Sequence, residues 1–297
     1  MLAKTPSGLQ RRAFVYERDV PRLQRFLARK RQKVAQAAYF QFGDLLWRIH
    51  HPANQFNPAS DLPIWENGDG TISGFGFLLR VQDNPEFYTD PELYDSRLGD
   101  EMIAWAIDVA RADGRTAIET SCIAGDERKA AFLGDHGFAC FGDPMLFQER
   151  RLDAPISDVT IPKEYIVAPL RVEATELSVT GDSPFPRAAY LAMRQAPGYR
   201  PDLDVKAYHG DAITAGCICW FDEIDGCGEL EPVGTHPDHR HRGLAAACIT
   251  QALRALREHG ATVAYVRPSK ANPAAVALYE KVGFRTVDED LGWRLSI

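Results

Sequence analysis

Long hydrophobic runs are absent from this sequence. Its 297 residues contain no stretch of about 18 uncharged apolar residues, which excludes a membrane-spanning helix of ordinary length. The segment MLAKTPSGLQRR carries charge but lacks the apolar core of a secretory signal. Only six cysteines occur, and their spacing matches no disulfide framework. We therefore expect a cytoplasmic protein with reduced thiols and no membrane partner.

The sequence also has fewer basic than acidic residues. The 34 lysines and arginines are outnumbered by 41 aspartates and glutamates, which gives a formal net charge of −7 at pH 7. General nucleic-acid binding needs a basic surface, so we expect no nucleic-acid partner. With 45% hydrophobic residues, the chain is long enough to bury two ordinary cores. Its composition does not separate a monomer from a homodimer.

The sequence does contain an internal repeat. Shifting the chain by 146 positions aligns residues of the first half with the second half without a gap. A match held in register over such a length indicates two copies of one α/β unit. We expect a first domain over residues 1–150, a second over 164–297, and a proline-containing linker over 151–163. The aligned pairs are Phe75 and Phe221, Pro91 and Pro237, Leu98 and Leu244, Ile103 and Ile249, Gly114 and Gly260, Thr116 and Thr262, Ala131 and Ala277, and Gly137-Phe138 and Gly283-Phe284.

The second copy shows its elements most clearly. Residues 212–221 and 228–235 are predicted to be strands joined by a turn at Asp225-Gly226. Apolar residues at helical spacing predict a helix over 243–258, with Gly260 just past its end. This order indicates a mixed, mostly antiparallel sheet flanked by helices in each copy. The remaining predicted elements are a strand over 262–267, a helix from Asn272-Pro273 to Gly283, and a last strand over 286–295.

The stretch HPDHRHRGLAAA, residues 236–247, predicts a binding site. Pro232 interrupts the preceding strand and predicts a bulge there, because proline cannot donate to a β-ladder. A glycine-bearing turn then opens a helix whose first N–H groups lack partners and whose dipole is positive at this end. Because Arg240 and Arg242 add charge at the same point, the helix start suits an anion such as a pyrophosphate.

The histidines of this stretch raise a metal site as the alternative. His236, His239 and His241 alternate along the turn, but no cysteine or carboxylate stands beside them at zinc-ligand spacing. We therefore expect no metal.

Two segments of the second half resemble the signature segments of the GCN5-related N-acetyltransferases, the GNAT family. In VGTHPDHRHRGLA, the run Arg240-His241-Arg242-Gly243-Leu244-Ala245 corresponds to the family pattern R/Q-x-x-G-x-G/A. ANPAAVALYEKVGF follows the pattern N-x-x-A-x-x-L-Y-x-x-x-G-F from Asn272 to Phe284. The resemblance covers residues 165–297 and implies two tandem GNAT-like domains, as in mycothiol synthase and related two-domain acetyltransferases.

The first half resembles the same fold more faintly. At the shift of 146, the positions of Arg240, Gly243, Asn272 and Tyr279 carry other residues. A bulky Arg97, where the backbone should approach phosphates, is expected to obstruct the site. We therefore expect the first copy to be a degenerate domain. The four substituted positions are Tyr94, Arg97, Asp126 and Leu133.

The resemblance implies direct attack by an amine on the acetyl group of acetyl-CoA. A general base must take a proton from the amine. Glu229 is the first candidate, because GELEPVG matches the position of the base in mycothiol synthase. Glu231 is the alternative, since it projects from the same face of the strand. One of the two could instead be an exposed strand carboxylate.

The same resemblance implies the remaining site residues. A main-chain N–H of Val233 would stabilise the oxyanion, and Thr235 would pair with the pantetheine arm. Tyr279 would protonate the departing thiolate, although its apolar neighbours also suit a core aromatic. Asn272 is expected to cap its helix and, in addition, to contact the cofactor. The implied cofactor-binding residues are Val233, Gly234, Thr235, Arg240, His241, Arg242, Gly243, Leu244, Ala245, Ala246, Asn272 and Tyr279.

The implied function is transfer of the acetyl group of acetyl-CoA to the primary amine of a small molecule, catalysed by the second copy. A protein or peptide N-acetyltransferase is the first alternative, because the sequence does not define the acceptor pocket. A non-catalytic CoA-binding sensor is the second alternative, which the retention of Glu229 and Tyr279 disfavours.

Overall fold

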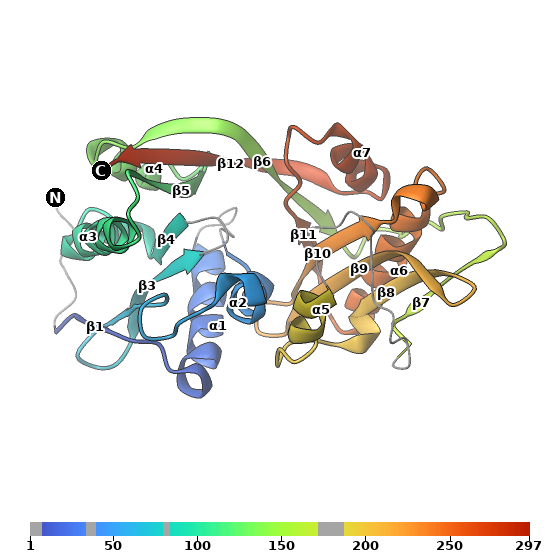
Figure 1. Cartoon of the computed structure of the whole chain (residues 1–297), viewed down its shortest axis with the longest axis horizontal. Coiled ribbons are helices and arrows are strands. Elements are labelled where there is room, and N and C mark those ends of the chain that lie inside the picture. Colours follow the sequence, from blue (N-terminus) through green and yellow to red (C-terminus); the bar gives the residue numbers. More distant parts are fainter. Residues whose placement is uncertain (1–7, 34–39, 80–83, 172–186) are drawn as a thin grey trace. The chain divides into compact units, whose positions relative to one another are not determined.

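The computed structural model describes residues 8–33, 40–79, 84–171 and 187–297 (Figure 1). Residues 1–7 lie outside these ranges. They belong to the N-terminal segment in which we expect no secretory signal. Within them, every helix is too short or too polar to cross a membrane. The chain forms two compact units. Unit 1 comprises Met1–Phe40, Ala53–Met145 and Asp288–Ile297, and unit 2 comprises Gln41–Pro52 and Leu146–Val287.

Unit 1 is built on a four-stranded antiparallel sheet with the strand order β1-β2-β3-β4. Helix α3 packs on it through buried residues such as Leu98 and Met102. The same core includes Phe132 of α4. The elements are β1 (Gln10–Arg12), α1 (Tyr16–Lys33), β2 (Ile64–Glu66), β3 (Ile72–Leu79), β4 (Asn84–Thr89), α3 (Arg97–Ala112), β5 (Ala117–Ile123) and α4 (Glu127–Asp135).

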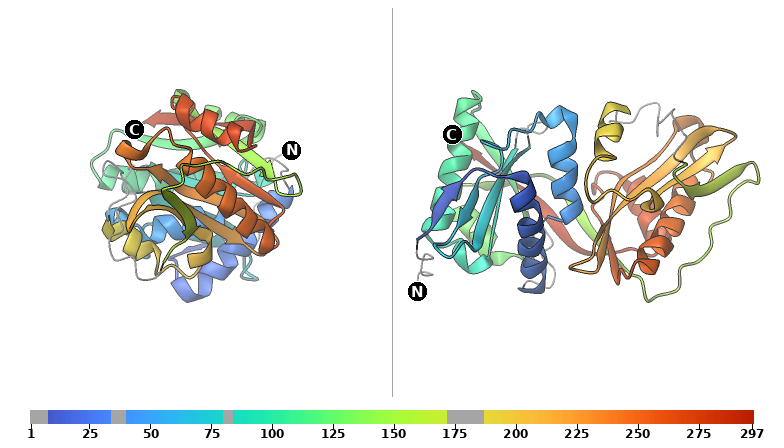
Figure 2. Two further views of the ribbon diagram at one scale, coloured as in Figure 1. Left: turned by 90° about the vertical axis from the view of Figure 1, so that its right-hand side faces the viewer. Right: turned by 90° about the horizontal axis from the view of Figure 1, so that it is seen from below.

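Unit 2 contains a mixed sheet with the strand order β6-β11-β10-β9-β8-β7. Strands β10 and β11 are parallel, and the other neighbours are antiparallel. Helix α6 covers one face of this sheet (Figure 2). The elements are α2 (Phe42–His50), β7 (Tyr165–Pro169), α5 (Arg187–Met193), β8 (Asp204–His209), β9 (Ala212–Asp222), β10 (Cys227–Thr235), α6 (Leu244–Glu258), β11 (Val263–Val266) and α7 (Pro273–Lys281). Strands β6 (Ala139–Arg151) and β12 (Arg285–Ser296) each run from one unit into the other.

Strand alternation sends neighbouring side chains of unit 2 to opposite faces of its sheet. Cys219 of β9 and Leu230 of β10 belong to the core that α6 covers. Trp220 and Glu229, each one residue away, approach Gly43 of α2 instead. Helix α2 therefore covers the face opposite to α6.

The predicted elements of the second copy and the repeat are both confirmed. Strands β9, β10, β11 and β12 and helices α6 and α7 lie where the sequence predicts them, with small shifts at their ends. Asp126 and Asn272 are 146 positions apart and cap α4 and α7. Each side chain accepts a hydrogen bond from the backbone N–H of the residue three positions later in the chain. Gly137 and Gly283 follow these helices with φ of 83° and 92°. The left-handed conformation explains glycine at both positions.

The two copies exchange their last strands, so the units are not the consecutive halves 1–150 and 164–297 that the sequence predicts. Strand β11 of the second copy pairs with Gln148–Arg151 of β6, which ends the first copy. Strand β5 of the first copy pairs with Asp290–Ser296 of β12. Each strand end belongs to the unit of the strand with which it forms ladder hydrogen bonds. Local sequence does not encode which strand that is.

The expected linker 151–163 is packed rather than free. Ile156, Val159 and Ile161 lie against the hydrophobic core of unit 2. Arg254 of α6 donates to Ile156 O at 3.0 Å and to Asp158 Oδ1 at 2.7 Å. The segment is therefore part of unit 2.

We expect residues 160–297 expressed alone to be poorly soluble or inactive. This fragment lacks α2 and the end of β6, so β11 keeps an unpaired edge and the α2 face of the sheet is exposed. Size-exclusion chromatography and thermal unfolding measure the effect, and co-expression with residues 1–159, which supply both segments, should restore a compact species. A monodisperse fragment with full activity would show that the first part of the chain is dispensable.

Candidate functional site

The start of α6 is an open helix N-terminus. His241 and Gly243 adopt left-handed conformations, with φ of 61° and 78°, and Gly243 as N-cap offers no side-chain acceptor. The amides of Leu244, Ala245 and Ala246 donate to no acceptor within the described ranges. The first turn contains no acidic residue. This end of the helix can therefore accept an anion, as the sequence predicts.

The predicted arginines lie exposed beside this helix start. Arg240 Nε donates to Thr235 O at 3.4 Å, and Arg242 donates to Asp238 O at 3.4 Å. Neither arginine forms a carboxylate ion pair with another described residue. Both guanidinium groups can therefore reach an anion at the helix start.

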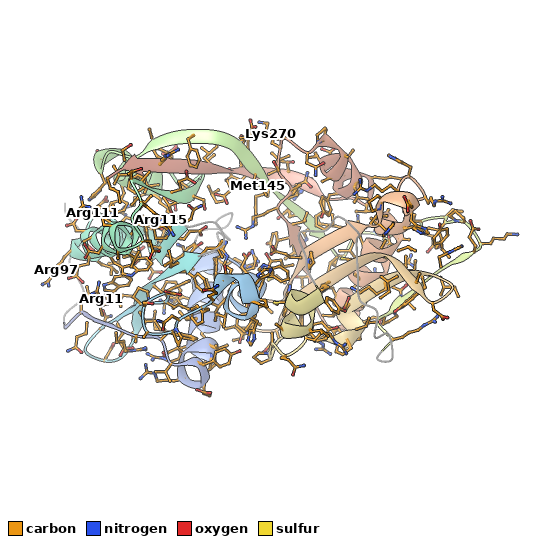
Figure 3. All side chains as sticks on the ribbon, in the orientation of Figure 1. Arg11, Arg97, Arg111, Arg115, Met145 and Lys270 are labelled. Atoms are coloured by element: carbon orange, nitrogen blue, oxygen red, sulfur yellow. The ribbon has the colours of Figure 1, made fainter. Side chains whose placement is uncertain are left out.

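The equivalent helix of the first copy is closed by its own sequence. The Ser96 hydroxyl accepts the Leu98 amide at 3.2 Å, and Asp100 adds a negative charge to the first turn of α3. Arg97, the residue expected to obstruct this helix start, is the first residue of α3. Its side chain is 76% exposed, bonds Glu101 at 2.8 Å and points outward (Figure 3). The serine cap therefore distinguishes the two helices.

The bulge predicted at Pro232 is present. The pairing of β10 with β9 shifts register between Leu230 and Val233. The ladder between β10 and β11 covers only Cys227–Glu229 and Val263–Tyr265, although β10 continues to Thr235. The ladder thus stops at Glu229, one residue before β11 itself ends at Val266.

Tyr279 and Asn272 hold α7 in place. Tyr279 is 7% exposed and packs in the core with its ring 5.8 Å from that of Phe284. Its hydroxyl has no hydrogen-bond partner among the residues that the structure describes. Burial raises the pKa of Tyr279, so the hydroxyl stays protonated at neutral pH. Asn272 accepts the Ala275 amide at 3.1 Å and is the expected helix cap.

Glu229 and Glu231 are joined by a third carboxylate that the sequence does not point to. Asp44, in the first turn of α2, donates its backbone N–H to Glu229 Oε2 at 3.1 Å. Carboxylate oxygens of Asp44, Glu229 and Glu231 lie within 4.8 Å of one another. Arg267 donates to both oxygens of Asp44, at 2.7 and 2.5 Å. A hard cation suits such an oxygen set, but Arg267 already balances Asp44.

Crowding of these carboxylates favours their protonated forms. Burial, followed by the charges of Asp44 and Glu231, raises the pKa of Glu229 well above its ordinary value. Burial and Asp44 raise the pKa of Glu231 to about 7, against the opposing effect of Arg267 and Arg48. The groups titrate together, because each charge changes the others. Glu229 is only 6% exposed, so the alternative of a plain surface carboxylate does not apply to it.

The histidines of the loop serve local contacts. His239 Nδ1 lies 2.8 Å from Tyr165 Oη, and His236 Nδ1 accepts the Asp238 amide at 3.3 Å. No histidine belongs to a group of three potential metal ligands in the described part of the chain.

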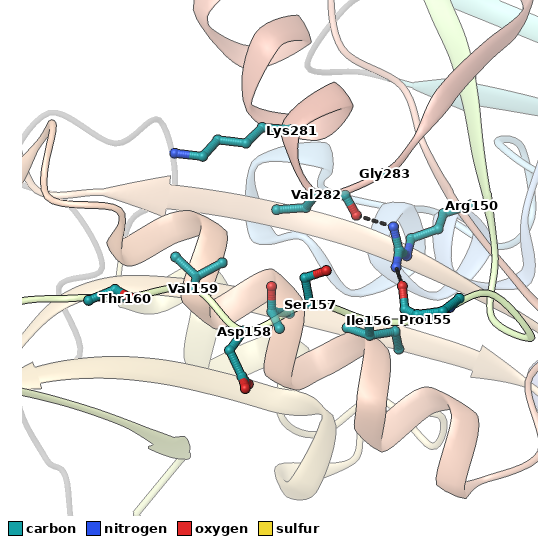
Figure 4. Close-up of a pocket in the computed structure, with 11 residues that line it drawn as sticks. Arg150, Pro155, Ile156, Ser157, Asp158, Val159, Thr160, Lys281, Val282 and Gly283 are labelled. Carbon is teal, nitrogen blue, oxygen red and sulfur yellow. Dashed lines mark hydrogen bonds between the residues drawn. The ribbon is translucent and has the colours of Figure 1, made fainter.

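A cavity of about 430 Å³ lies in unit 2 beside segment 155–160 (Figure 4). Thr250 of α6 and Val282 at the end of α7 contribute to its wall. Arg150 joins the segment to α7 by donating to Val282 O and, at 2.8 Å, to Pro155 O. Gly283 makes this possible, because a Cβ there would meet Arg150 Nη1 at 1.6 Å. None of the site residues predicted from the sequence lines this cavity.

Part of unit 2 matches a known protein family. Residues 173–284 fit the acetyltransferase (GNAT) family model. This part of the chain is a GNAT domain. The GNAT domain includes the α6 start, both β10 carboxylates and Tyr279, whereas Asp44 lies outside it.

The whole chain has the fold of a tandem GNAT protein. The tandem GNAT protein from the clavulanic acid biosynthesis pathway has a TM-score of 0.70 at 17% identity, covering 97% of this chain and 98% of that one. A GCN5-related N-acetyltransferase from Sphaerobacter thermophilus has a TM-score of 0.66 at 18% identity, covering 99% and 97%. At such identities the likeness concerns the fold.

Sequence similarity to curated proteins is local. The mycothiol acetyltransferase of Streptomyces scabiei is 39% identical over 98 residues, which are 33% of this chain and 32% of that protein. The matched part is about a third or less of the length of each mycothiol acetyltransferase compared.

We expect Glu231→Gln to weaken the pH dependence of stability. The pKa of Glu231 is raised from 4.5 to about 7, so its stabilising contribution is complete below pH 4.5 and is lost as the pH rises to about 7. Glutamine is neutral throughout, so the variant should lose less unfolding free energy over this window than the native chain. Urea unfolding at several pH values measures it. The exposed Glu223→Gln should retain the native slope, and an unchanged slope in Glu231→Gln would contradict the assignment.

Proposed function

We propose that this chain is an N-acetyltransferase that transfers the acetyl group of acetyl-CoA to the primary amine of a small molecule. One observation carries the proposal. The uncapped, arginine-flanked start of α6 directly follows β10, the strand that bears the buried carboxylate of Glu229 and the half-buried one of Glu231. An anion site for the cofactor and a proton acceptor for the amine thus stand in sequence within one GNAT domain.

In the proposed reaction the α6 amides and Arg240 and Arg242 bind the pyrophosphate of acetyl-CoA. The neutral amine attacks the thioester carbon, and the N–H of Val233, at the bulge, stabilises the resulting oxyanion. Glu229 takes the proton that the nitrogen loses. The C–S bond then breaks, and Tyr279 protonates the departing thiolate.

Two features support these proton-transfer roles. The raised pKa of Glu229 makes its ionised carboxylate a stronger base than an exposed one, which suits it to take the proton that the attacking nitrogen loses. Tyr279 keeps its proton at neutral pH and has a hydroxyl without a described partner. Glu231, with its pKa of about 7, remains the alternative base.

Acetyl-CoA offered with a panel of small primary amines and a lysine peptide tests the activity. Mass spectrometry of the products and free-thiol release report transfer, and a blank without acetyl-CoA corrects for the exposed Cys140 thiol. Transfer to small amines supports the proposal. Transfer to the peptide alone indicates a protein acetyltransferase, and binding without transfer indicates a sensor.

We expect one acetyl-CoA site per chain, which Gly243→Arg abolishes. A side chain at φ 78° strains the loop by about 1 to 3 kcal/mol and displaces the α6 amides, so affinity should fall about 10-fold or more. Calorimetric titration measures both stoichiometry and affinity. Gly114→Arg is the matched control, because Gly114 also has a positive φ of 72° and follows α3 in open space. Two equal sites, or unchanged affinity in Gly243→Arg, would refute the assignment.

Tyr279→Phe should lower kcat by about 10²- to 10⁴-fold while KM for acetyl-CoA changes little. Phenylalanine keeps the packing against Phe284 and removes only the proton donor. Single-turnover measurements isolate the chemical step. Tyr208→Phe, which removes another buried hydroxyl from unit 2, should leave kcat close to that of the native chain. If chemistry limits the rate and kcat is unaltered, Tyr279 is a core aromatic only.

A further inference from the structure

We propose that Gly43 and Asp44, in the first turn of α2, are positioning residues for the general base Glu229 and keep Arg267 from pairing with it. The inference rests on the proposed function and adds a contribution from outside the GNAT domain. Asp44 and Glu229 are 185 positions apart in the sequence, yet both belong to unit 2.

Helix α2 begins with a turn that is built for close approach. Gln41 and Asp44 form a capping box, in which the Gln41 amide donates to Asp44 Oδ2 at 2.9 Å. A Cβ on Gly43 would stand 2.6 Å from Glu229 Oε2 and equally close to the Trp220 side chain. Only glycine therefore lets this turn lie directly on the carboxylate and the indole.

The turn presents a hydrogen-bond donor to Glu229. The Asp44 N–H belongs to the first turn of a nine-residue helix, where amides lack partners within the helix and the dipole is positive. Its hydrogen bond to Oε2, at 3.1 Å, fixes the orientation of the Glu229 carboxylate. Trp220 constrains the same strand, since its Nε1 donates to Glu231 O at 3.0 Å.

The Asp44 side chain meanwhile pairs with an arginine. Arg267, just past β11, donates to both Asp44 oxygens, and the Asp44 side chain is only 4% exposed. An arginine paired directly with Glu229 would stabilise the ionised carboxylate and weaken it as a base. Asp44 thus holds the guanidinium while leaving Glu229 able to take a proton.

Charged and titratable groups from several elements surround Glu229 and Glu231. The titratable and charged groups that face Glu229 and Glu231 are Asp44 and Arg48 of α2, the two β10 carboxylates themselves, Arg267 after β11, and Tyr279 of α7. A side-chain hydrogen bond also joins Asp44 to Glu231, so a change at Asp44 acts on both β10 carboxyl groups.

Asp44→Asn tests the electrostatic part of the inference. It removes the charge but keeps the backbone N–H, and it takes away the carboxylate that pairs with Arg267. We expect the acidic limb of the kcat/KM profile to move to lower pH by about 1 to 3 units. Arg267→Gln should move the limb to higher pH, because the stabilising cation is lost. Asp108→Asn, at an exposed position of α3, is the control and should leave the limb unchanged.

Gly43→Ala tests the positioning part. The new methyl group forces the turn away from Glu229, so kcat should fall about 10-fold or more at every pH, with KM for acetyl-CoA unchanged. Gly134→Ala is the matched control, since Gly134 lies in helix α4 with open space around its Cβ position. Thermal unfolding of both variants shows whether they remain folded.

A readout without turnover separates this inference from the proposed function. In protein with 13C-labelled glutamate, the Glu229 carboxyl signal, assigned by its loss in Glu229→Gln, should titrate at lower pH in Asp44→Asn and at higher pH in Arg267→Gln. Such shifts without acetyl transfer would support the role of Asp44 and refute the enzyme. Acetyl transfer with an unmoved Glu229 titration and an unmoved acidic limb would refute the role of Asp44.

Discussion

Burial of the Glu229 carboxylate is the constraint on which the rest of this structure depends. A carboxylate withdrawn from water needs hydrogen bonds or a nearby cation, and Glu229 receives the amide of Asp44 together with the field of Arg267. That arrangement needs α2 on the sheet, a glycine at position 43, and a cation at the end of β11. Segment Gln41–Pro52 therefore belongs to unit 2, although the chain enters unit 1 on both sides of it.

A second constraint acts at the end of β10. Pro232 breaks the pairing with β9, the ladder of β10 with β11 ends at Glu229, and α6 starts with no acidic residue and with amides that have no acceptor among the described residues. The first copy has the same elements at a shift of 146, but there Ser96 satisfies the helix start. The two copies thus share an architecture but differ in their helix caps. Ser96 caps α3 with its side chain, whereas Gly243 offers α6 no side-chain acceptor.

The exchange of β6 and β12 explains how two copies become one folded protein. Each copy supplies the strand that completes the other's ladder, so neither unit is a continuous piece of chain. Segment 155–160 also makes unit 2 depend on residues that follow the first copy. Arg150 joins this segment to the end of α7, and Arg254 joins it to α6. The first copy therefore contributes structure to unit 2 even though its own helix start is closed.

The sequence by itself determined the elements of the second copy, the repeat, the bulge at Pro232 and the open start of α6. These depend on local patterns: apolar periodicity, helix caps, a strand proline and a glycine-bearing turn. Tertiary structure alone decided which strand completes which sheet, and it brought Asp44 and Arg267 to Glu229. Neither the strand pairing nor this cluster follows from local sequence, because ladders and ion pairs join residues that are far apart in the chain. The segment Gln41-Phe42-Gly43-Asp44 by itself looks like an ordinary helix start. The pKa values of Glu229 and Glu231 are likewise decided by the tertiary structure, since burial and neighbouring charges set them.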